Sequence, residues 1–365
     1  MSGLRRVRGL LLLGTVLLLM AGLLAVLSGC GGETSTGAEG TTTAAPATNF
    51  DKTASLMNDL LNSPAALQTI TAADLNTILT NGKPADAPLV LDVRDAADYQ
   101  QPSDKSPGHI PGAINVPFRK IADPDNIAKI NAELAKHQNK TIVVHCYTGH
   151  TQGINVPILF DLAKDGKLGS PVPKIVGLDW GMMGYNSVEK APSYSNTFPL
   201  ETTTAAAAGN FQLPSVGDLL TQAQMVLPDM PGRLNVGSDQ TVNKMPLSSY
   251  TIIDIRSATD YAQGHIPGAK NLPYQDLFKR EGDTYPNLAK IDHSKQVLVT
   301  GDRQDLEEFV AVGLNLLGIS QQKSNTAALG FGIATWNNTV GRQFTAGDKQ
   351  AFPAVSGTAT GGPAN

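Results

Sequence analysis

The chain is short of cysteine, of aromatic residues and of charge. Its 365 residues include two cysteines, Cys30 and Cys146, with 5% aromatic and 16% charged residues and a formal net charge of −4. Two cysteines exclude a disulfide-rich scaffold, and the weakly negative charge argues against a nucleic-acid-binding protein. Aliphatic side chains must therefore fill most of the cores, and the length allows two or three domains.

One long hydrophobic run is present, and it lies at the N-terminus. Three arginines precede the apolar run Leu10–Leu27, and Ser28-Gly29-Cys30 follows it. This arrangement is typical of an export signal. The ending resembles the lipobox of bacterial lipoproteins, which implies cleavage before Cys30, acylation of its thiol and anchoring on the outer, or periplasmic, face of the cell membrane. The alternative is an uncleaved signal anchor, because the run approaches membrane-spanning length.

Three further segments have too little apolar surface to form a core. Residues 31–48 and the end of the chain are rich in Gly, Thr and Ala, and residues 201–209 read ETTTAAAAG. Segments of such composition do not fold by themselves. We therefore expect a flexible tether, a disordered tail and a linker at these places.

The rest of the chain is a duplication. Leu89–Arg94 (LVLDVR) matches Thr251–Arg256 (TIIDIR), and the hexapeptide GHIPGA occurs at Gly108–Ala113 and again at Gly264–Ala269. In each copy β-branched runs alternate with segments of helical periodicity, which favours an α/β fold with a parallel sheet covered by helices on both faces. The predicted segments are a signal peptide at 1–29, a tether at 30–48, a catalytic domain at 49–200, a linker at 201–209, an inactive domain at 210–345, expected to fold alone, and a tail at 346–365.

In the first copy, one cysteine stands where a parallel sheet binds its ligands. The predicted elements are helices at 71–80, 127–137, 158–164 and 182–185 and strands at 89–93, 141–145 and 174–176, with Thr71 as an N-cap. Cys146 directly follows the strand at 141–145, and ligands of such sheets bind beyond the carboxyl ends of the strands.

The sequence around Cys146 predicts a reactive thiol. A strand, a short polar loop and the start of a helix direct backbone N–H groups and a positive dipole end to one point. A thiol at that point is expected to be present as a thiolate at neutral pH. The alternative is a small core hydrophobe at a strand end.

The motifs together resemble the rhodanese (sulfurtransferase) superfamily. They are Asp92–Arg94, Gly108–Pro117, Val144–Thr151 and Gly177–Asn186. The resemblance implies a tandem rhodanese in which Cys146 takes sulfane sulfur from a small-molecule donor such as thiosulfate. The resulting persulfide passes the sulfur to cyanide or a thiol. It implies no cofactor and no metal site.

The residues after the cysteine are expected to form the substrate-binding loop. Tyr147 and Thr148 are expected to contribute mainly backbone N–H groups, and Gly149 allows the loop to curl around the sulfur. His150 has three alternatives: it orients a donor's anionic oxygens, relays a proton, or is a half-exposed loop residue. Thr151 is expected to cap the following helix.

Four residues of the repeated motifs are expected to be structural. Asp92 and Arg94 suit buried polar contacts that hold the fold. His109 and His265 occupy matching positions in both copies, including the copy that lacks a cysteine. Their presence in a copy without a nucleophile favours a structural role for both.

Three positions depart from what related families need. Gln152 stands where a cysteine phosphatase of the His-Cys-(five residues)-Arg type needs its arginine, which argues against phosphoryl transfer. Pro157 weakens the expected helix dipole. Gly301 occupies the place of the cysteine in the second copy, so that copy is predicted to be inactive. The alternative to an enzyme is a non-catalytic sulfane-sulfur carrier, sensor or scaffold module.

Overall fold

The structure is a computed structural model. It describes residues 47–63, 68–83, 86–102, 108–186, 197–202, 209–230, 233–234, 247–319, 326–348 and 350. The predicted signal peptide, Cys30 and most of the predicted tether, linker and tail lie outside these residues. Among the described helices, none is both long and apolar enough to cross a membrane.

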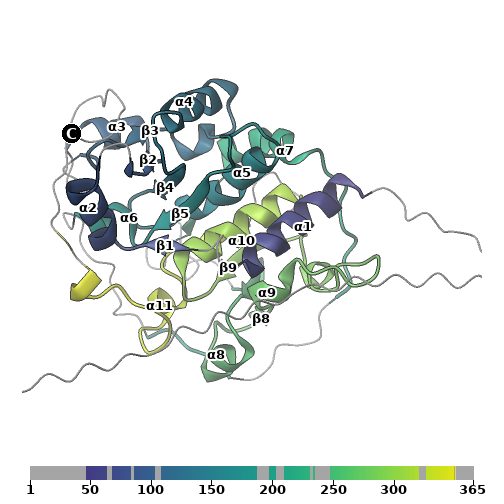
Figure 1. Cartoon of the computed structure of the whole chain (residues 1–365). Coiled ribbons are helices and arrows are strands. Elements are labelled where there is room, and N and C mark those ends of the chain that lie inside the picture. The colour runs from purple at the N-terminus through teal and green to yellow at the C-terminus, as the bar shows by residue number, and fades with distance from the viewer. Residues whose placement is uncertain are drawn as a thin grey trace, which may run out of the picture. The chain divides into compact units, whose positions relative to one another are not determined.

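Each copy of the repeat forms a five-stranded sheet of parallel strands (Figure 1). The first contains β1 (Thr69–Ile70), β2 (Leu89–Asp92), β3 (Ile114–Asn115), β4 (Thr141–His145) and β5 (Lys174–Leu178), in the order β1-β5-β4-β2-β3. The second contains β6 (Arg233–Leu234), β7 (Tyr250–Asp254), β8 (Lys270–Asn271), β9 (Gln296–Thr300) and β10 (Thr326–Leu329), in the order β6-β10-β9-β7-β8. The matching orders confirm the predicted duplication and the α/β fold.

Helices connect the strands in both halves. The first half contains α1 (Asn49–Asn62), α2 (Ala72–Asn81), α3 (Ala96–Gln100), α4 (Pro124–Leu134), α5 (Gln152–Lys164) and α6 (Gly181–Tyr185). The second contains α7 (Leu219–Val226), α8 (Ala258–Gln263), α9 (Tyr274–Leu277), α10 (Gln304–Leu316) and α11 (Ile333–Trp336). Short 3-10 turns are η2 (Phe118–Lys120), η3 (Leu227–Asp229), η4 (Leu247–Ser249), η5 (Leu288–Lys290) and η6 (Ala346–Asp348). The turn η6 shows that ordered chain continues slightly past residue 346.

The predicted elements are present, but two helices begin earlier than expected. Thr71 caps α2 as predicted, because its Oγ1 accepts the Asp74 N–H at 3.1 Å. The helix α4 begins at Pro124, since proline suits a first helical turn. The helix α5 begins at Gln152 and runs through Pro157. This helix is almost wholly buried, so its packing outweighs the local cost of the proline.

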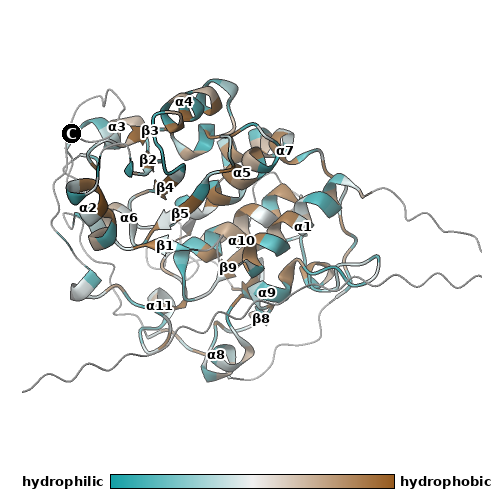
Figure 2. Ribbon diagram, viewed as in Figure 1, coloured by the Kyte–Doolittle hydropathy of each residue, from teal (hydrophilic) through white to brown (hydrophobic). Residues whose placement is uncertain are grey.

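The strands bury both faces, as their unbroken apolar sequences indicate. In β2, Leu89 and Leu91 join one hydrophobic cluster while Val90, which lies between them, joins another. This alternation follows from the two-residue period of a strand. The first cluster contains residues of α1, α5, α7 and α10 together with residues of both sheets. Hydrophobic residues accordingly concentrate on the central helices in Figure 2.

The helix α1 packs against the second half, although it precedes the first half in the chain. It lies beside α10 in Figure 1 and also contacts α9. Fully buried Met57 packs directly over Gly313 of α10. Asp51 accepts a 2.9 Å hydrogen bond from the Tyr285 hydroxyl, and the Asn62 amide donates to the Gln275 carbonyl at 2.9 Å.

The segment α7–η3 packs in the reciprocal direction. It precedes the second half, yet α7 contacts α5 and η3 contacts η2, both in the first half. The Gln224 side chain donates to the Ala122 carbonyl at 3.0 Å, and Arg119 donates to the Met230 carbonyl at 3.2 Å. Each leading helix therefore contacts both halves, and the two halves share one core. The expectation that residues 210–345 fold alone stays a prediction, and that segment lacks α1.

A substitution in α1 tests the shared core. Met57→Ala removes a fully buried side chain at the contact with α10, and we expect a loss of about 2–5 kcal/mol in unfolding free energy. The whole described fold should still unfold in one transition. The control is Ser55→Ala, at an exposed position of the same helix. Two denaturation transitions, of which only one shifts in Met57→Ala, would contradict a common core.

Candidate active site

Both halves use the same buried ion pair to fix the carboxyl end of a strand. Asp92 at the end of β2 accepts hydrogen bonds of 2.5–3.1 Å from the Arg94 side chain, and Arg94 also donates to the Gly108 carbonyl at 2.9 Å. Asp254 and Arg256 repeat the pair in the second half. Because the pair is present in both halves, the structural role predicted for Asp92 and Arg94 is confirmed.

The repeated histidines also hold the fold. The His109 ring stacks on Tyr99, with centroids 3.8 Å apart, and its Nδ1 lies 2.8 Å from the Tyr99 carbonyl oxygen. His265 stacks on Tyr261 at 3.6 Å with an equivalent contact of 2.9 Å. Both histidines are buried, and the predicted structural role is confirmed for both.

Cys146 follows the central strand of the first sheet. From β2 the chain runs to β3 at one edge, and from β4 it runs to β5 on the other side. The end of β4 is therefore the point where the strand order reverses, which is where open parallel sheets bind ligands. Cys146 is the free cysteine of the described residues and is 4% exposed.

The start of α6 holds the loop that begins at Cys146. The Met182 N–H donates to the Cys146 carbonyl at 2.8 Å, and the Met183 N–H donates to the Tyr147 carbonyl at 2.7 Å. Since a trans peptide places its N–H opposite its C=O, the N–H groups of Tyr147 and Thr148 point away from α6. Gly181 permits this approach: its φ is +52°, and a Cβ there would lie 2.6 Å from the Cys146 carbonyl oxygen.

A buried histidine lies directly before the cysteine. His145 is fully buried, and its Nε2 lies 3.6 Å from Asp92 Oδ2. Burial lowers the pKa of His145, so its ring is neutral near pH 7. Burial alone would raise the pKa of Asp92, but the hydrogen bonds and the positive charge of Arg94 outweigh burial and hold that pKa below its ordinary value. The charged groups closest to His145, Asp92 and Arg94, are therefore paired with each other.

The structure places the other residues of the predicted loop as follows. The Tyr147 ring lies under the Arg94 guanidinium, 4.8 Å from its carbon, and Thr148 is buried. Gly149 has a φ of +88°, as a sharp turn requires. Thr151 stands at the N-cap position of α5, but its side chain makes no capping hydrogen bond, so the expected cap is wrong. Thr151 has helical backbone angles, and its carbonyl instead accepts from the Asn155 amide at 2.8 Å.

His150 faces the second half of the molecule. Its Nε2 accepts the Phe331 N–H at 3.1 Å, and its Nδ1 lies 3.7 Å from Glu308 Oε1. Its ring also meets the Phe331 ring edge-on at 5.3 Å. The side chain is 2% exposed, which excludes the half-exposed position considered from the sequence. Phe331 and Glu308 belong to the second half, so both halves form the surroundings of the cysteine loop.

The equivalent loop of the second half is shorter, and a side chain occupies the space beside its first residue. Gly301 follows β9, and its carbonyl accepts the Ile333 N–H at 2.9 Å, as that of Cys146 accepts the Met182 N–H. Between strand and helix this half has residues 301–303, whereas the first has 146–151. The Glu307 side chain lies against Gly301, with Oε1 3.2 Å from where a Cβ would stand. Burial, with Asp302 nearby, raises the pKa of Glu307 well above its ordinary value, so this acid is neutral.

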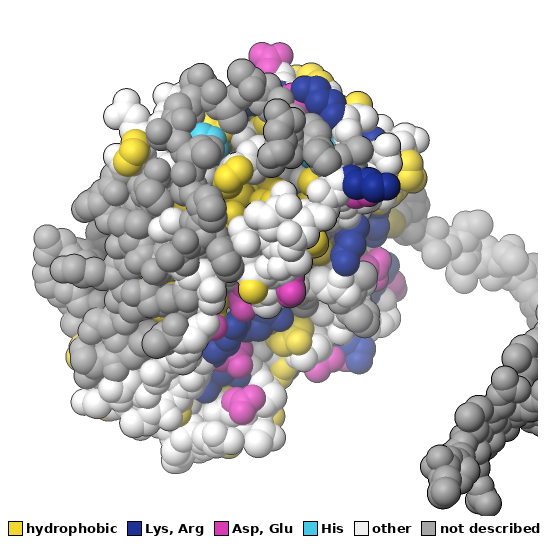
Figure 3. All heavy atoms as spheres, turned by 60° about the vertical axis from the view of Figure 1, so that its left-hand side comes forward, with side chains coloured by type: hydrophobic (Ala, Val, Ile, Leu, Met, Phe, Trp, Pro, Cys, Tyr) yellow, Lys and Arg dark blue, Asp and Glu magenta, His cyan; other side chains and the backbone are white. Residues whose placement is uncertain are grey.

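The loop opens toward a small cavity between the two halves. Its volume is about 10 Å³, and its lining comes from Gly149, Gln152, Asp179, Trp180, Asp302, Arg303, Gln304, Asp305 and Arg342. Two ion pairs border it: Arg342–Asp179 at 2.8 Å and Arg303–Asp305 at 2.7 Å. The side of the molecule that carries α2 and α3 likewise shows basic and acidic side chains next to one another (Figure 3). The cavity holds about one water molecule, so a larger ligand requires these side chains to move.

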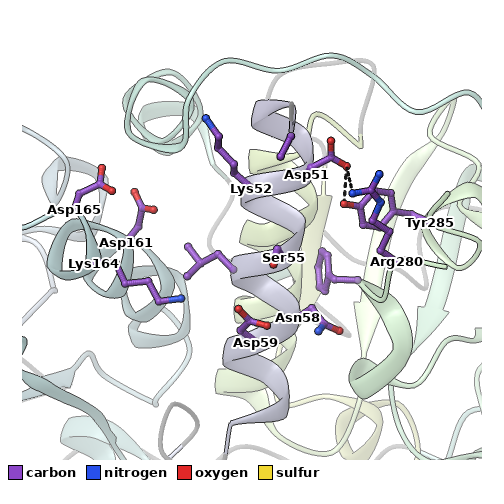
Figure 4. Close-up of a pocket in the computed structure, with 13 residues that line it drawn as sticks. Asp51, Lys52, Ser55, Asn58, Asp59, Asp161, Lys164, Asp165, Arg280 and Tyr285 are labelled. Carbon is purple, nitrogen blue, oxygen red and sulfur yellow. Dashed lines mark hydrogen bonds and ion pairs between the residues drawn. The ribbon is translucent and has the colours of Figure 1, made fainter. Parts of the chain in front are cut away.

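A larger groove lies elsewhere and has different chemistry. It encloses about 520 Å³ along α1, with Asp161, Lys164 and Asp165 on one side of the helix and Arg280 and Tyr285 on the other (Figure 4). Burial and Asp165 raise the pKa of Asp161 to about 6. The groove has no cysteine in its lining, so it does not compete with the cysteine loop as a site of sulfur chemistry.

Sequence reasoning missed the residues that the second half contributes. Phe331 donates a backbone N–H, which no side-chain pattern reveals. Glu307 and Glu308 are fully buried in α10. Two adjacent acids between Leu306 and Phe309 in an apolar helical segment were the available signal, because buried carboxylates are rare. The described residues contain no group of three or more His, Cys, Asp or Glu side chains arranged to hold a metal ion.

Comparison with known proteins shows that this chain matches one protein family. The Rhodanese-like domain family matches residues 71–187 and 239–336. The structure is similar to a thiosulfate sulfurtransferase from Pseudomonas aeruginosa, with 17% identity, 82% of this chain and 49% of that chain covered and a TM-score of 0.27. It is also similar to a rhodanese-related protein from Thermoplasma volcanium, with 18% identity and a TM-score of 0.20. This match covers 32% of this chain and 89% of that chain. A third similar structure is that of wild-type EanB, with 16% identity and a TM-score of 0.24. This match covers 75% of this chain and 60% of that chain.

The chain thus spans about half the length of the Pseudomonas sulfurtransferase. Among proteins with curated descriptions, none matches it. Each of the two family matches covers four of the five strands of one sheet, all but β1 or β6, and together they cover more than half of the residues. The chain belongs to the rhodanese-like domain family and contains two tandem domains of it.

Proposed function

We propose that the protein is a sulfurtransferase that carries sulfane sulfur on Cys146. The observation that carries this proposal is the free cysteine at the carboxyl end of β4, where the strand order reverses, in a loop held by the start of α6. The donor is a small sulfane-sulfur compound such as thiosulfate, and the acceptor is cyanide or a thiol. No cofactor takes part.

The reaction has two displacement steps. The Cys146 thiolate attacks the outer sulfur of thiosulfate, a sulfur–sulfur bond forms, and the bond to sulfite breaks as sulfite leaves with the electron pair. The enzyme then holds a persulfide anion. Cyanide or a thiolate attacks the terminal sulfur of that persulfide, and the Cys146 thiolate leaves. Oxidation state is conserved overall, and two separate half-reactions give ping-pong kinetics.

The loop supplies what the persulfide anion needs. The N–H groups of Tyr147 and Thr148 point away from α6, and the turn at Gly149 curves the loop. Backbone N–H groups in such a turn bind anions. A cysteine phosphatase would need a guanidinium to bind the transferred phosphoryl group, and its place is taken by Gln152. Sulfur transfer therefore suits this loop better than phosphoryl transfer.

A non-catalytic sulfur carrier is the second candidate. The observation that favours it is the 4% exposure of Cys146, because a carrier benefits from a shielded persulfide. Turnover with thiosulfate and cyanide distinguishes the two functions: a carrier gains one sulfur and stops, whereas an enzyme continues to release thiocyanate.

We further propose that the protein is exported and anchored by lipid on Cys30. The support is the sequence alone: an arginine-flanked apolar run that ends in Leu27-Ser28-Gly29-Cys30. Small residues before the cysteine admit a signal peptidase, and the thiol takes the acyl chain. The Gly-, Thr- and Ala-rich segment that follows would let the two domains meet diffusible donors.

The first test concerns the nucleophile. Wild-type protein treated with thiosulfate should gain one sulfur on the peptide that contains Cys146, as measured by mass spectrometry. Cys146→Ser should abolish both this gain and thiocyanate formation, because a hydroxyl forms no persulfide. The matched control is Cys30→Ser, which should keep the activity of the detergent-solubilised protein. Sulfur transfer at the wild-type rate by Cys146→Ser would refute the proposal.

The second test concerns the silent half. A Cys146→Ser/Gly301→Cys double variant should stay as inactive as Cys146→Ser alone, because the second loop is shorter and Glu307 fills the space beside Gly301. The new side chain would also begin 3.0 Å from Ile255. Thiocyanate production is the measurement. Recovery of activity would show that the second half lacks only a thiol.

The third test concerns the membrane anchor. The protein from the membrane fraction should begin at Cys30, and its mass should exceed that of the polypeptide by acyl chains. More than one chain is needed for stable attachment, since each buried methylene contributes about 0.8 kcal/mol. N-terminal sequencing and intact mass measure this. An unmodified Cys30 in a chain that keeps residues 1–29 would favour the signal anchor instead.

A further inference from the structure

The loop that carries Cys146 is three residues longer than its counterpart, and the extra length reaches the other half. Residues 146–151 connect β4 to α5, whereas residues 301–303 connect β9 to α10. At the end of the longer loop, the buried His150 contacts Phe331 and Glu308. A catalytically silent half therefore touches the cysteine loop of the active one.

The contact with Phe331 fixes the state of the histidine ring. A backbone N–H can only donate, so Nε2 of His150 must accept the 3.1 Å hydrogen bond from Phe331. In a neutral imidazole the proton then resides on Nδ1. This nitrogen lies 3.7 Å from Oε1 of Glu308, whose carboxylate side chain is fully buried. A proton on Nδ1 therefore faces a carboxyl oxygen, and the opposite partial charges of the two groups attract each other.

The positions of both partners are set by packing rather than by flexible side chains. Phe331 precedes α11 and has a φ of +60°, a conformation it shares with Trp180 at the same place in the first half. Glu308 lies in α10, whose contact with α5 is so close that a Cβ on Gly153 would collide with the Asp305 carbonyl oxygen. Neither partner can follow a displaced His150 without disturbing the interface.

We propose that His150 is a positioning residue, held by the Phe331 N–H and the Glu308 carboxylate of the second half, and that this hold fixes the loop around Cys146. The inference rests on the sulfur transfer proposed for Cys146. Both ring nitrogens of His150 face groups of the second half, and through these contacts the ring acts on the loop backbone. The silent half thereby becomes a required part of the active site.

The discriminating experiment compares two replacements at one position. His150→Gln keeps an oxygen that can accept the Phe331 N–H, whereas His150→Ala keeps nothing. If His150 positions the loop, kcat with thiosulfate and cyanide should fall by about 10–100-fold in His150→Ala, since small misplacements of a nucleophile have effects of that size. His150→Gln should stay within about threefold of the wild type, because the hydrogen bond is restored. Equal losses in both variants would show that the imidazole itself takes part in the chemistry and would overturn the proposal.

A second readout does not depend on sulfur transfer. Cys146 is 4% exposed, so its alkylation by iodoacetamide in the full-length protein should be slow. The rate is read on the Cys146 peptide, which separates it from Cys30. The alkylation rate should rise by about fivefold or more in His150→Ala and Glu308→Ala, because a loop without these contacts opens more often. Unchanged alkylation in both variants would overturn the proposal.

The adjacent acid provides the matched control. Glu307→Gln replaces a fully buried acid, whose pKa is raised well above its ordinary value, by an amide of the same size, and Glu307 lies in α10 against Gly301 of the silent loop. It should leave both kcat and the alkylation rate unchanged, and a change as large as that of Glu308→Ala would contradict a specific role of Glu308. If His150→Ala does not fold by circular dichroism, His150→Asn, which is too short to reach Phe331, takes its place. Wild-type protein that transfers no sulfur but shows the expected alkylation pattern would refute the sulfurtransferase and leave the positioning role intact.

Discussion

The contact between α5 and α10 is the constraint on which the rest of the structure depends. Gly153 lets α5 approach the backbone of α10 at Asp305, and nearly every side chain of both helices is buried. Because each of these helices follows the central strand of its sheet, their contact brings the two loop regions together. It also merges two cores into one, which α1 and α7 complete by packing on the opposite halves. Domain boundaries drawn along the sequence do not correspond to independent units here.

The two halves share a scaffold and differ at one loop. Both have a buried aspartate–arginine pair after the second strand of the half and a histidine stacked on a tyrosine. Burying such charges is costly unless they are paired, and the short hydrogen bonds in each pair offset that cost. The scaffold therefore holds its shape without a nucleophile. The two halves differ in the six residues that connect β4 to α5 and in how the second half contacts them.

The sequence predicted the strands and the repeated motifs, which depend on local residue patterns. The repeated motifs, the strand at 141–145 and the place of Gly301 are confirmed, because strand periodicity and internal repetition need no knowledge of distant contacts. The contacts of α1 and α7 with the opposite halves were not predictable, since the sequence of an amphipathic helix does not specify which surface the helix covers. The orientation of His150 was missed for the same reason: both of its partners lie more than 150 residues away in the chain. Because of Pro157, the sequence placed the start of α5 too late. In the structure the burial of this helix outweighs the low helix propensity of proline.

The unequal lengths of the two loops bear on how a duplicated gene could have reached this form. The helices α5 and α10 contact each other, and His150 lies against the turn at Phe331. A second loop of the same length would have to enter this region from the opposite side, where Gln304 already lies 3.1 Å from a Cβ position on Gly149. Two copies with long loops would therefore compete for one volume. In this packing, the short loop of the second half leaves room for the long loop of the first.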